Sequence, residues 1–133
     1  ASGFKLDSRV QVQQPLGFHD YNWLQMNAFA VVSDSGTLPE ESSFYASIGK
    51  PISAVCIRTS TERPEAIDKA CFILSGIDTK GLLQSVDLAV QMTKDGNHGI
   101  PVPSYTDDVS NKVVKIIQSY VGVVNKMVWR KEI

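Results

Sequence analysis

The sequence has little of three things that would narrow its function at once: cysteine, charge of one sign and long apolar runs. Its two cysteines, Cys56 and Cys71, stand in apolar surroundings without the spacing or the histidines of a metal site. We expect them to be buried free thiols in a reducing, cytoplasmic compartment. The net charge of −1 supplies no field to gather nucleic acid or an anionic membrane surface. No run of about 20 apolar residues is present to span a bilayer. From the charge and the absence of such a run, we expect neither nucleic acid nor a membrane as a partner.

A recognisable catalytic arrangement is also missing. No serine, cysteine or histidine stands in a pattern that pairs a nucleophile with its base. No cluster of histidine, cysteine and carboxylate has metal-ligand spacing. We therefore expect no catalytic residue, no metal and no cofactor in this chain, and look for a binding function.

The 133 residues do contain an alternation of short apolar runs and helical patterns. The predicted strands are residues 9–13, 29–32, 52–57 and 70–74, and the predicted helices are residues 21–27, 38–47, 64–68 and 79–92. Asp20 is the expected N-cap of the first helix. The almost wholly apolar run 52–57 predicts a central strand covered on both faces. This order favours one α/β domain, with a Rossmann-like parallel sheet flanked by helices.

The last part of the chain differs in pattern. Residues 94–107 contain glycine and proline without periodicity and predict a loop or linker, with His98 at the surface. From residue 108 to 130 one apolar stripe recurs at helical spacing, which predicts a long terminal helix capped by Asp107 or Asp108. The stripe is longer than one small sheet needs.

The most informative stretch joins the second predicted strand to the helix that follows it. Residues 33–36 are turn formers, and Thr37 with Glu40 fits a capping box. A strand that enters a helix through small residues leaves backbone N–H groups free to bind an anion. Ser35, Gly36 and Thr37 could therefore hold a phosphate or a carboxylate. A well-capped helix that binds nothing is the open alternative.

Two arginines follow the predicted central strand. In such sheets ligands bind beyond the carboxyl ends of the strands, where Arg58 and Arg63 are expected. A guanidinium group can pair with a phosphate through two hydrogen bonds. The alternative is a surface ion pair with Glu62 or Glu65.

Three further side chains are candidates at the same edge. If Glu40 closes the capping box, Glu41 is free, and a carboxylate there suits neutral hydroxyls such as a ribose diol. Its alternative role is to complement the helix dipole. Tyr21 could stack on a base, and His19 could donate to an anion, although a lone histidine is more often structural.

Several motifs, in this order along the chain, resemble the C-terminal half of non-hydrolysing UDP-N-acetylglucosamine 2-epimerases. They are GFHDY at residues 17–21, SDSG at 33–36 followed by Glu40-Glu41, GKP at 49–51 and TERPEA at 61–66. The terminal helix resembles the branch that makes UDP-N-acetyl-L-fucosamine or related sugars for bacterial polysaccharides. The resemblance covers nearly the whole chain.

This resemblance implies a two-domain GT-B enzyme that inverts C2 of a UDP-sugar by eliminating and re-adding UDP. The chain would be its C-terminal, UDP-binding domain, inactive alone, with the proton chemistry in an N-terminal domain that this chain lacks. The family is often homodimeric. The implied contacts are Ser35, Gly36 and Thr37 to the diphosphate, Arg63 to the phosphates, Glu41 to the ribose and Tyr21 near uracil. Many members have a second glycine in place of Thr37.

Two other functions remain open from the sequence. One is the nucleotide-sugar-binding domain of a GT-B glycosyltransferase, which transfers sugar to an acceptor. The other is a non-catalytic interaction module whose terminal helix docks a partner.

Overall fold

The computed structural model describes residues 3, 5–105 and 108–131. Its elements follow in chain order as α1 (Phe18–Asn27), β1 (Val31–Ser33), α2 (Leu38–Ser47), β2 (Ala54–Cys56), α3 (Pro64–Asp68), β3 (Ile73–Leu74), α4 (Thr79–Lys94), the 3₁₀ turn η1 (Pro103–Tyr105) and α5 (Val109–Met127).

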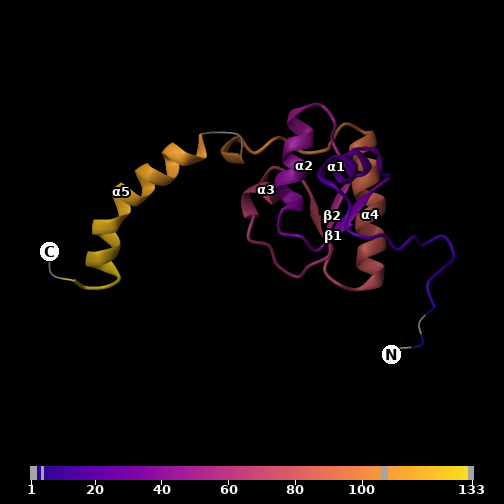
Figure 1. The fold of residues 1–133 in the computed structure, drawn as a ribbon, viewed down its shortest axis with the longest axis horizontal. Coiled ribbons are helices and arrows are strands. Elements are labelled where there is room, and N and C mark those ends of the chain that lie inside the picture. Colours follow the sequence, from indigo (N-terminus) through magenta and orange to yellow (C-terminus); the bar gives the residue numbers. More distant parts are fainter. Residues whose placement is uncertain (1–2, 4, 106–107, 132–133) are drawn as a thin grey trace.

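The three strands form one parallel sheet in the order β1-β2-β3. Val31 pairs with Ala54 and Val55 pairs with Ile73. Helices α2 and α3 lie on one side of this sheet and α4 on the other (Figure 1). All three residues of β2 are buried. The prediction of a parallel, Rossmann-like sheet with a doubly covered central strand is confirmed.

The core lies between the sheet and its helices. Leu38 and Tyr45 enter it from α2, and Val102 enters from the segment that follows α4. The amide of Val102 donates to Ser43 Oγ at 2.7 Å, so this segment is bound to the body of the domain. The buried members of the core cluster are Leu38, Tyr45, Ile52, Ala54, Cys56, Ala66, Cys71, Phe72 and Val102.

The prediction of a strand at residues 9–13 is wrong. These residues have neither strand nor helix structure, and all of them are exposed. Alternation favours a strand only where one face can be buried, and here Val10 and Val12 have nothing to pack against. The turn at this point is instead held by Arg9, which makes two side-chain hydrogen bonds to Asp7.

Several other boundaries differ from the prediction: the strands predicted at 29–32 and 52–57 are the shorter β1 and β2, and the helix predicted at 79–92 ends at Lys94. Helix α1 begins at Phe18 with Gly17 as its N-cap, so Asp20 lies in the first turn instead of capping it. The strand predicted from residue 70 begins only at Ile73, because Ala70 has a φ of 56° and turns the chain. The short helix at 64–68 and the helix at 38–47 are confirmed.

The cysteine prediction is confirmed: Cys56 and Cys71 are both free and buried. Burial raises the pKa of both thiols, which keeps them protonated and unreactive. Within the described ranges, no helix combines the length and the apolar character that crossing a membrane requires.

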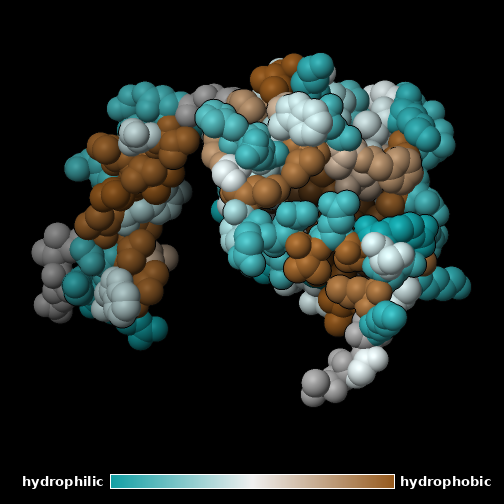
Figure 2. All heavy atoms as spheres, turned by 45° about the vertical axis from the view of Figure 1, so that its right-hand side comes forward, coloured by the Kyte–Doolittle hydropathy of each residue, from teal (hydrophilic) through white to brown (hydrophobic). Residues whose placement is uncertain are grey.

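The terminal helix α5 forms as its periodicity predicts, and Asp108 caps it by accepting the N–H of Asn111 at 3.3 Å. Asp107, the other predicted cap, lies outside the described residues. The helix extends away from the sheet (Figure 1), and none of its residues is buried. Figure 2 shows hydrophobic side chains along it, and Ile116, Tyr120 and Val124 are among its exposed residues.

We expect the backbone amides of α5 to exchange with solvent at least about tenfold faster than those of α4, because most helical stability in proteins comes from tertiary packing and no residue of α5 is buried. Amide exchange measured by NMR on dilute protein tests this expectation, with α4, which packs on β2 and β3, as the internal control. Equal protection of the two helices, up to the last turn of α5, would contradict it.

Candidate functional site

The turn between β1 and α2 is shaped by its own hydroxyl groups. The amide of Ser35 donates to Ser33 Oγ at 3.0 Å, and the amide of Thr37 donates to Ser35 Oγ at 3.2 Å. The hydroxyls of Ser35 and Thr37 are 2.9 Å apart. Because alternate amides bond within the turn, the N–H of Gly36 between them has no acceptor among the described residues and can meet a ligand.

The predicted capping box does not form. Thr37 is the N-cap, but its backbone is already helical and its side chain accepts no capping hydrogen bond. Its hydroxyl donates instead to Glu41 Oε1 at 3.0 Å. Glu40, the predicted partner in the box, accepts Arg63 Nε at 2.7 Å. The spacing of Thr37 and Glu40 fits a capping box, but the Glu40 carboxylate is engaged in the ion pair with Arg63.

The carboxylate of Glu41 is held from two elements. Thr37 donates to one oxygen, and Gln25 of α1 donates from Nε2 to the other at 3.0 Å. Burial raises the pKa of the Tyr21 hydroxyl, and the charge of the neighbouring Glu41 carboxylate raises it further. A fixed carboxylate next to a half-exposed aromatic ring can accept from hydroxyl groups of a ligand that also stacks.

A hollow of about 670 Å³ opens in front of this carboxylate, within the usual range for a small-molecule site. Aromatic rings form much of its wall, and Glu40 and Glu41 supply its charge. Its lining residues are Phe18, Tyr21, Asn22, Glu40, Glu41, Phe44, Tyr45, Ser104, Tyr105 and Val109.

Beside the turn there is also a polar hollow of about 520 Å³, lined by Asp34, Ile57, Arg58, Thr59, Ser60 and Ile77. These residues follow the carboxyl ends of β1, β2 and β3. A Cβ atom on Gly36 would meet Arg58 Nη1 at 4.0 Å, so the guanidinium lies over the turn. Thr37 bonds to Glu41 of the aromatic hollow and Gly36 lies next to Arg58 of the polar hollow, so the turn adjoins lining residues of both.

Both arginines are paired in this structure. Arg58 makes two hydrogen bonds to Glu62, of 2.9 and 2.7 Å, and these raise the pKa of Arg58 and lower that of Glu62. The predicted alternative of an ion pair with Glu62 therefore holds for Arg58. Arg63 pairs with Glu40 instead of Glu62 or Glu65. A ligand phosphate would share or replace these carboxylates.

His19 stands apart from the other candidates. It belongs to the first turn of α1, not to a loop, and its exposed ring contacts Phe18 edge to face. It does not line either hollow. The structure therefore brings together Tyr21, Glu41 and the turn, with Arg58 beside it, but not His19.

Gln25 is the contact that sequence reasoning missed. Its partner Glu41 lies 16 residues further along the chain, and the neighbouring Trp23 and Leu24 have the composition of packing residues. In the structure those two are exposed and Gln25 is buried. A polar residue on the buried face of a short helix was the only available signal.

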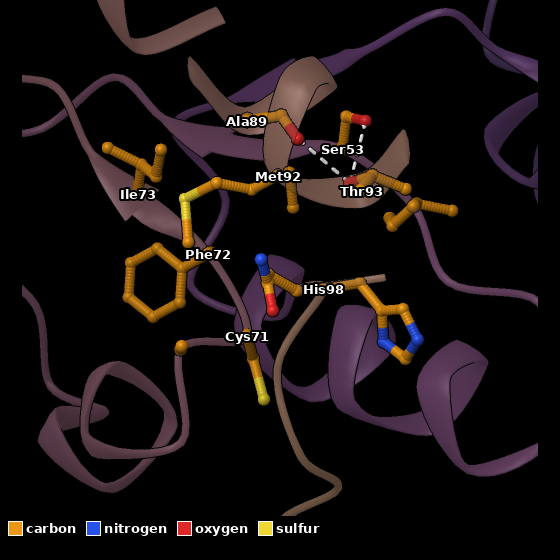
Figure 3. A pocket seen from close by; sticks show the side chains of 12 residues that line it. Ser53, Cys71, Phe72, Ile73, Ala89, Met92, Thr93 and His98 are labelled. Atoms are coloured by element: carbon orange, nitrogen blue, oxygen red, sulfur yellow. Dashed lines mark hydrogen bonds between the residues drawn. The ribbon is translucent and has the colours of Figure 1, made fainter. Parts of the chain in front are cut away.

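A third cavity lies at the opposite, amino ends of β2 and β3 (Figure 3). Ser53 donates to Thr93, which donates to the carbonyl of Ala89, and Phe72 and Met92 line the apolar part. His98, expected at the surface, is half-buried here, with Nδ1 buried and unpaired among the described residues. The volume of about 70 Å³ suits water but no substrate. The described residues also contain no group of three metal-ligand side chains.

Comparison with known proteins identifies the family to which the chain is similar. Residues 2–118 match the family model described as UDP-N-acetylglucosamine 2-epimerase. A UDP-N-acetylglucosamine 2-epimerase of Methanococcus maripaludis is 30% identical over 97 residues, covering 68% of this chain and 25% of the relative. That of Escherichia coli K12 is 32% identical over 83 residues, covering 62% and 20%. A solved structure of the Rickettsia bellii protein of that name aligns with a TM-score of 0.62 and 38% identity, over 90% of this chain and 32% of that one.

Proposed function

Because the chain belongs to the UDP-N-acetylglucosamine 2-epimerase family, we propose that it is the UDP-binding domain of an enzyme that inverts C2 of a UDP-2-acetamido sugar. The observation that carries this proposal is the Ser35–Thr37 turn, which adjoins lining residues of the aromatic hollow and Arg58. The substrate would be the precursor of a bacterial surface polysaccharide, in the branch that makes UDP-N-acetyl-L-fucosamine.

The two hollows divide the nucleotide between them. Tyr21 would contact uracil in the aromatic hollow, and Glu41 would accept from the ribose hydroxyls. The diphosphate would lie over the turn, where Gly36 presents its N–H and Arg58 its guanidinium. Arg63, held by Glu40 on the first turn of α2, would reach the phosphates from the adjoining loop.

This assignment gives the chain the leaving-group half of the reaction. In the proposed sequence the C2 proton is lost, the C1–O bond breaks with its electrons passing to UDP, and a glycal remains. Reprotonation of C2 on the other face and re-addition of UDP complete the inversion. The residues proposed here stabilise the negative diphosphate while it is detached, and they move no proton.

The chain spans about a quarter of the length of the Methanococcus relative. We infer that a second, N-terminal domain supplies the proton chemistry in a GT-B arrangement, and that the exposed stripe of α5 contacts it. The glycosyltransferase alternative predicts sugar transfer to an acceptor without epimerisation at C2, which an assay of the longer protein would distinguish.

Titration of the chain with UDP, followed by NMR, tests the binding proposal. We expect the amide signals of residues 35–38, Glu40, Glu41 and Tyr21 to shift at sub-millimolar UDP. No shift there up to millimolar UDP would overturn the proposal.

Gly36→Ala is expected to weaken UDP binding by at least about tenfold, because its methyl group would occupy the space next to the exposed N–H. The fold tolerates this methyl group, since it would meet only Arg58 Nη1, at 4.0 Å, and Gly36 lacks a positive φ. Gly122→Ala on α5, which has nothing within 4 Å, is the matched control. Equal affinity of the Gly36 variant and wild type would exclude close contact of the diphosphate with the turn.

A further inference from the structure

Helix α1 buries an amide, whereas its large apolar side chains are exposed apart from Met26, which is half-buried against the core. Gln25 is 4% exposed and is the only buried residue of this helix. The two residues directly before it, Trp23 and Leu24, are exposed. Packing alone would place leucine or methionine at the buried position, because an amide has to be desolvated there. The choice of glutamine needs a reason other than core packing.

The contacts of Gln25 point to Glu41 as that reason. Nε2 donates to Glu41 Oε2 at 3.0 Å, while Oε1 is buried without a partner among the described residues. The orientation of the amide follows from chemistry, because an ionised carboxylate only accepts. A buried Oε1 without a partner destabilises the fold. The hydrogen bond from Nε2 to Glu41 therefore comes with a cost in stability that core packing does not explain.

The geometry of Glu41 shows what this bond does. Thr37 donates to Oε1 from the turn, and Gln25 donates to Oε2 from α1, so each oxygen is tied to a different element. Two donors on two oxygens restrict rotation of the carboxylate about its last torsion. Each oxygen keeps a lone pair that can accept from another donor.

We propose that Gln25 is a positioning residue for ribose recognition: it fixes the Glu41 carboxylate so that both of its oxygens face the two vicinal hydroxyls of the nucleotide sugar. This inference rests on the proposed function and adds to it. Gln25 itself does not touch the ligand, because it is buried and does not line the hollow in which Glu41 lies. Its proposed effect is on the recognition of the two ribose hydroxyls. It also lies beside the Tyr21 hydroxyl, whose pKa burial and Glu41 raise and Gln25 lowers.

The test uses two ligands, UDP and 2′,3′-dideoxy-UDP, titrated calorimetrically into the chain. Gln25→Met keeps the volume of the side chain and removes the amide. We expect this variant to lower UDP affinity by about five- to tenfold, the loss of one aligned hydrogen bond, and to leave the affinity for the dideoxy ligand unchanged. If Gln25 had only a structural role, the variant would lower the affinity for both ligands by the same factor.

Gln91→Leu is the matched control, because Gln91 also donates from Nε2 to a carboxylate, that of Asp95, on the exposed face of α4. It should change neither affinity. If Gln25→Met fails to fold, Gln25→Asn, whose amide is too short to reach Glu41, replaces it. Equal losses for both ligands, or no loss for UDP, would overturn the positioning role while leaving UDP binding intact. Failure of the wild-type chain to bind UDP would overturn both proposals.

Discussion

Replacing Arg58 with methionine is expected to weaken UDP binding by about tenfold to a hundredfold, the range for hydrogen bonds to charged groups. The guanidinium lies over Gly36, where the proposed site places the diphosphate. Its removal also leaves the Glu62 carboxylate without its partner, so a negative charge then faces the ligand. Calorimetric titration with UDP measures the loss.

The double variant Arg58→Met/Glu62→Gln separates these two causes, because it removes the guanidinium without leaving a bare carboxylate. Most of the affinity loss should remain in it. Arg9→Met is the matched control, since Arg9 makes the same paired contact with Asp7 in an exposed segment. An affinity in the double variant equal to that of wild type would show that Arg58 does not contact the ligand.

Leu38→Ala is expected to lower the free energy of unfolding by about 3 kcal/mol, a typical cost for emptying a buried leucine site. Leu38 is 0% exposed and belongs to the core cluster beneath the turn. It is also the first residue of α2, so its packing fixes where the helix begins. Urea unfolding followed by circular dichroism gives the free energy by linear extrapolation.

Leu83→Ala on α4 is the control for this stability prediction, because Leu83 is 61% exposed. It should change the free energy of unfolding by less than about 0.5 kcal/mol. A loss below about 1 kcal/mol for Leu38→Ala would mean that the start of α2 collapses onto the cavity, and that the turn is less rigid than its hydrogen bonds indicate.

The sequence predicted those parts of the fold that a local pattern of apolar residues specifies. The apolar run at 52–57 could only be a covered strand, and Ala54, Val55 and Cys56 form the central strand β2. The stripe from 108 to 130 predicted α5. The prediction of a strand at residues 9–13 was wrong. Alternation of polar and apolar residues shows which face of a strand could be buried, but it does not show whether another element packs against that face.

The position of the β1–α2 turn was predictable from the sequence, but the pairing of the side chains around it was not. Small residues between a strand and a helix located the turn, since that spacing is local. The carboxylate that pairs with each arginine depends on the path of the loop between β2 and α3. This path brings Arg63 to Glu40 of α2. The bond from Gln25 to Glu41 joins helices that no local pattern relates, so only the folded chain revealed it.

Helix α1 is joined to α2 by polar contacts and to the core by half-buried Met26, and this has a consequence for the order of events during binding. Tyr45 of α2 donates to Asn22 Oδ1, and Gln25 donates to Glu41 of α2, while Gln25 is the one fully buried side chain of α1. Elements with so little buried apolar surface open at a small free-energy cost compared with global unfolding. A ligand held by Tyr21 on α1 and Glu41 on α2 bridges that seam, so its binding free energy suppresses the opening. The wall of the aromatic hollow would thus be loosely closed in the free chain and become ordered as the nucleotide is taken up.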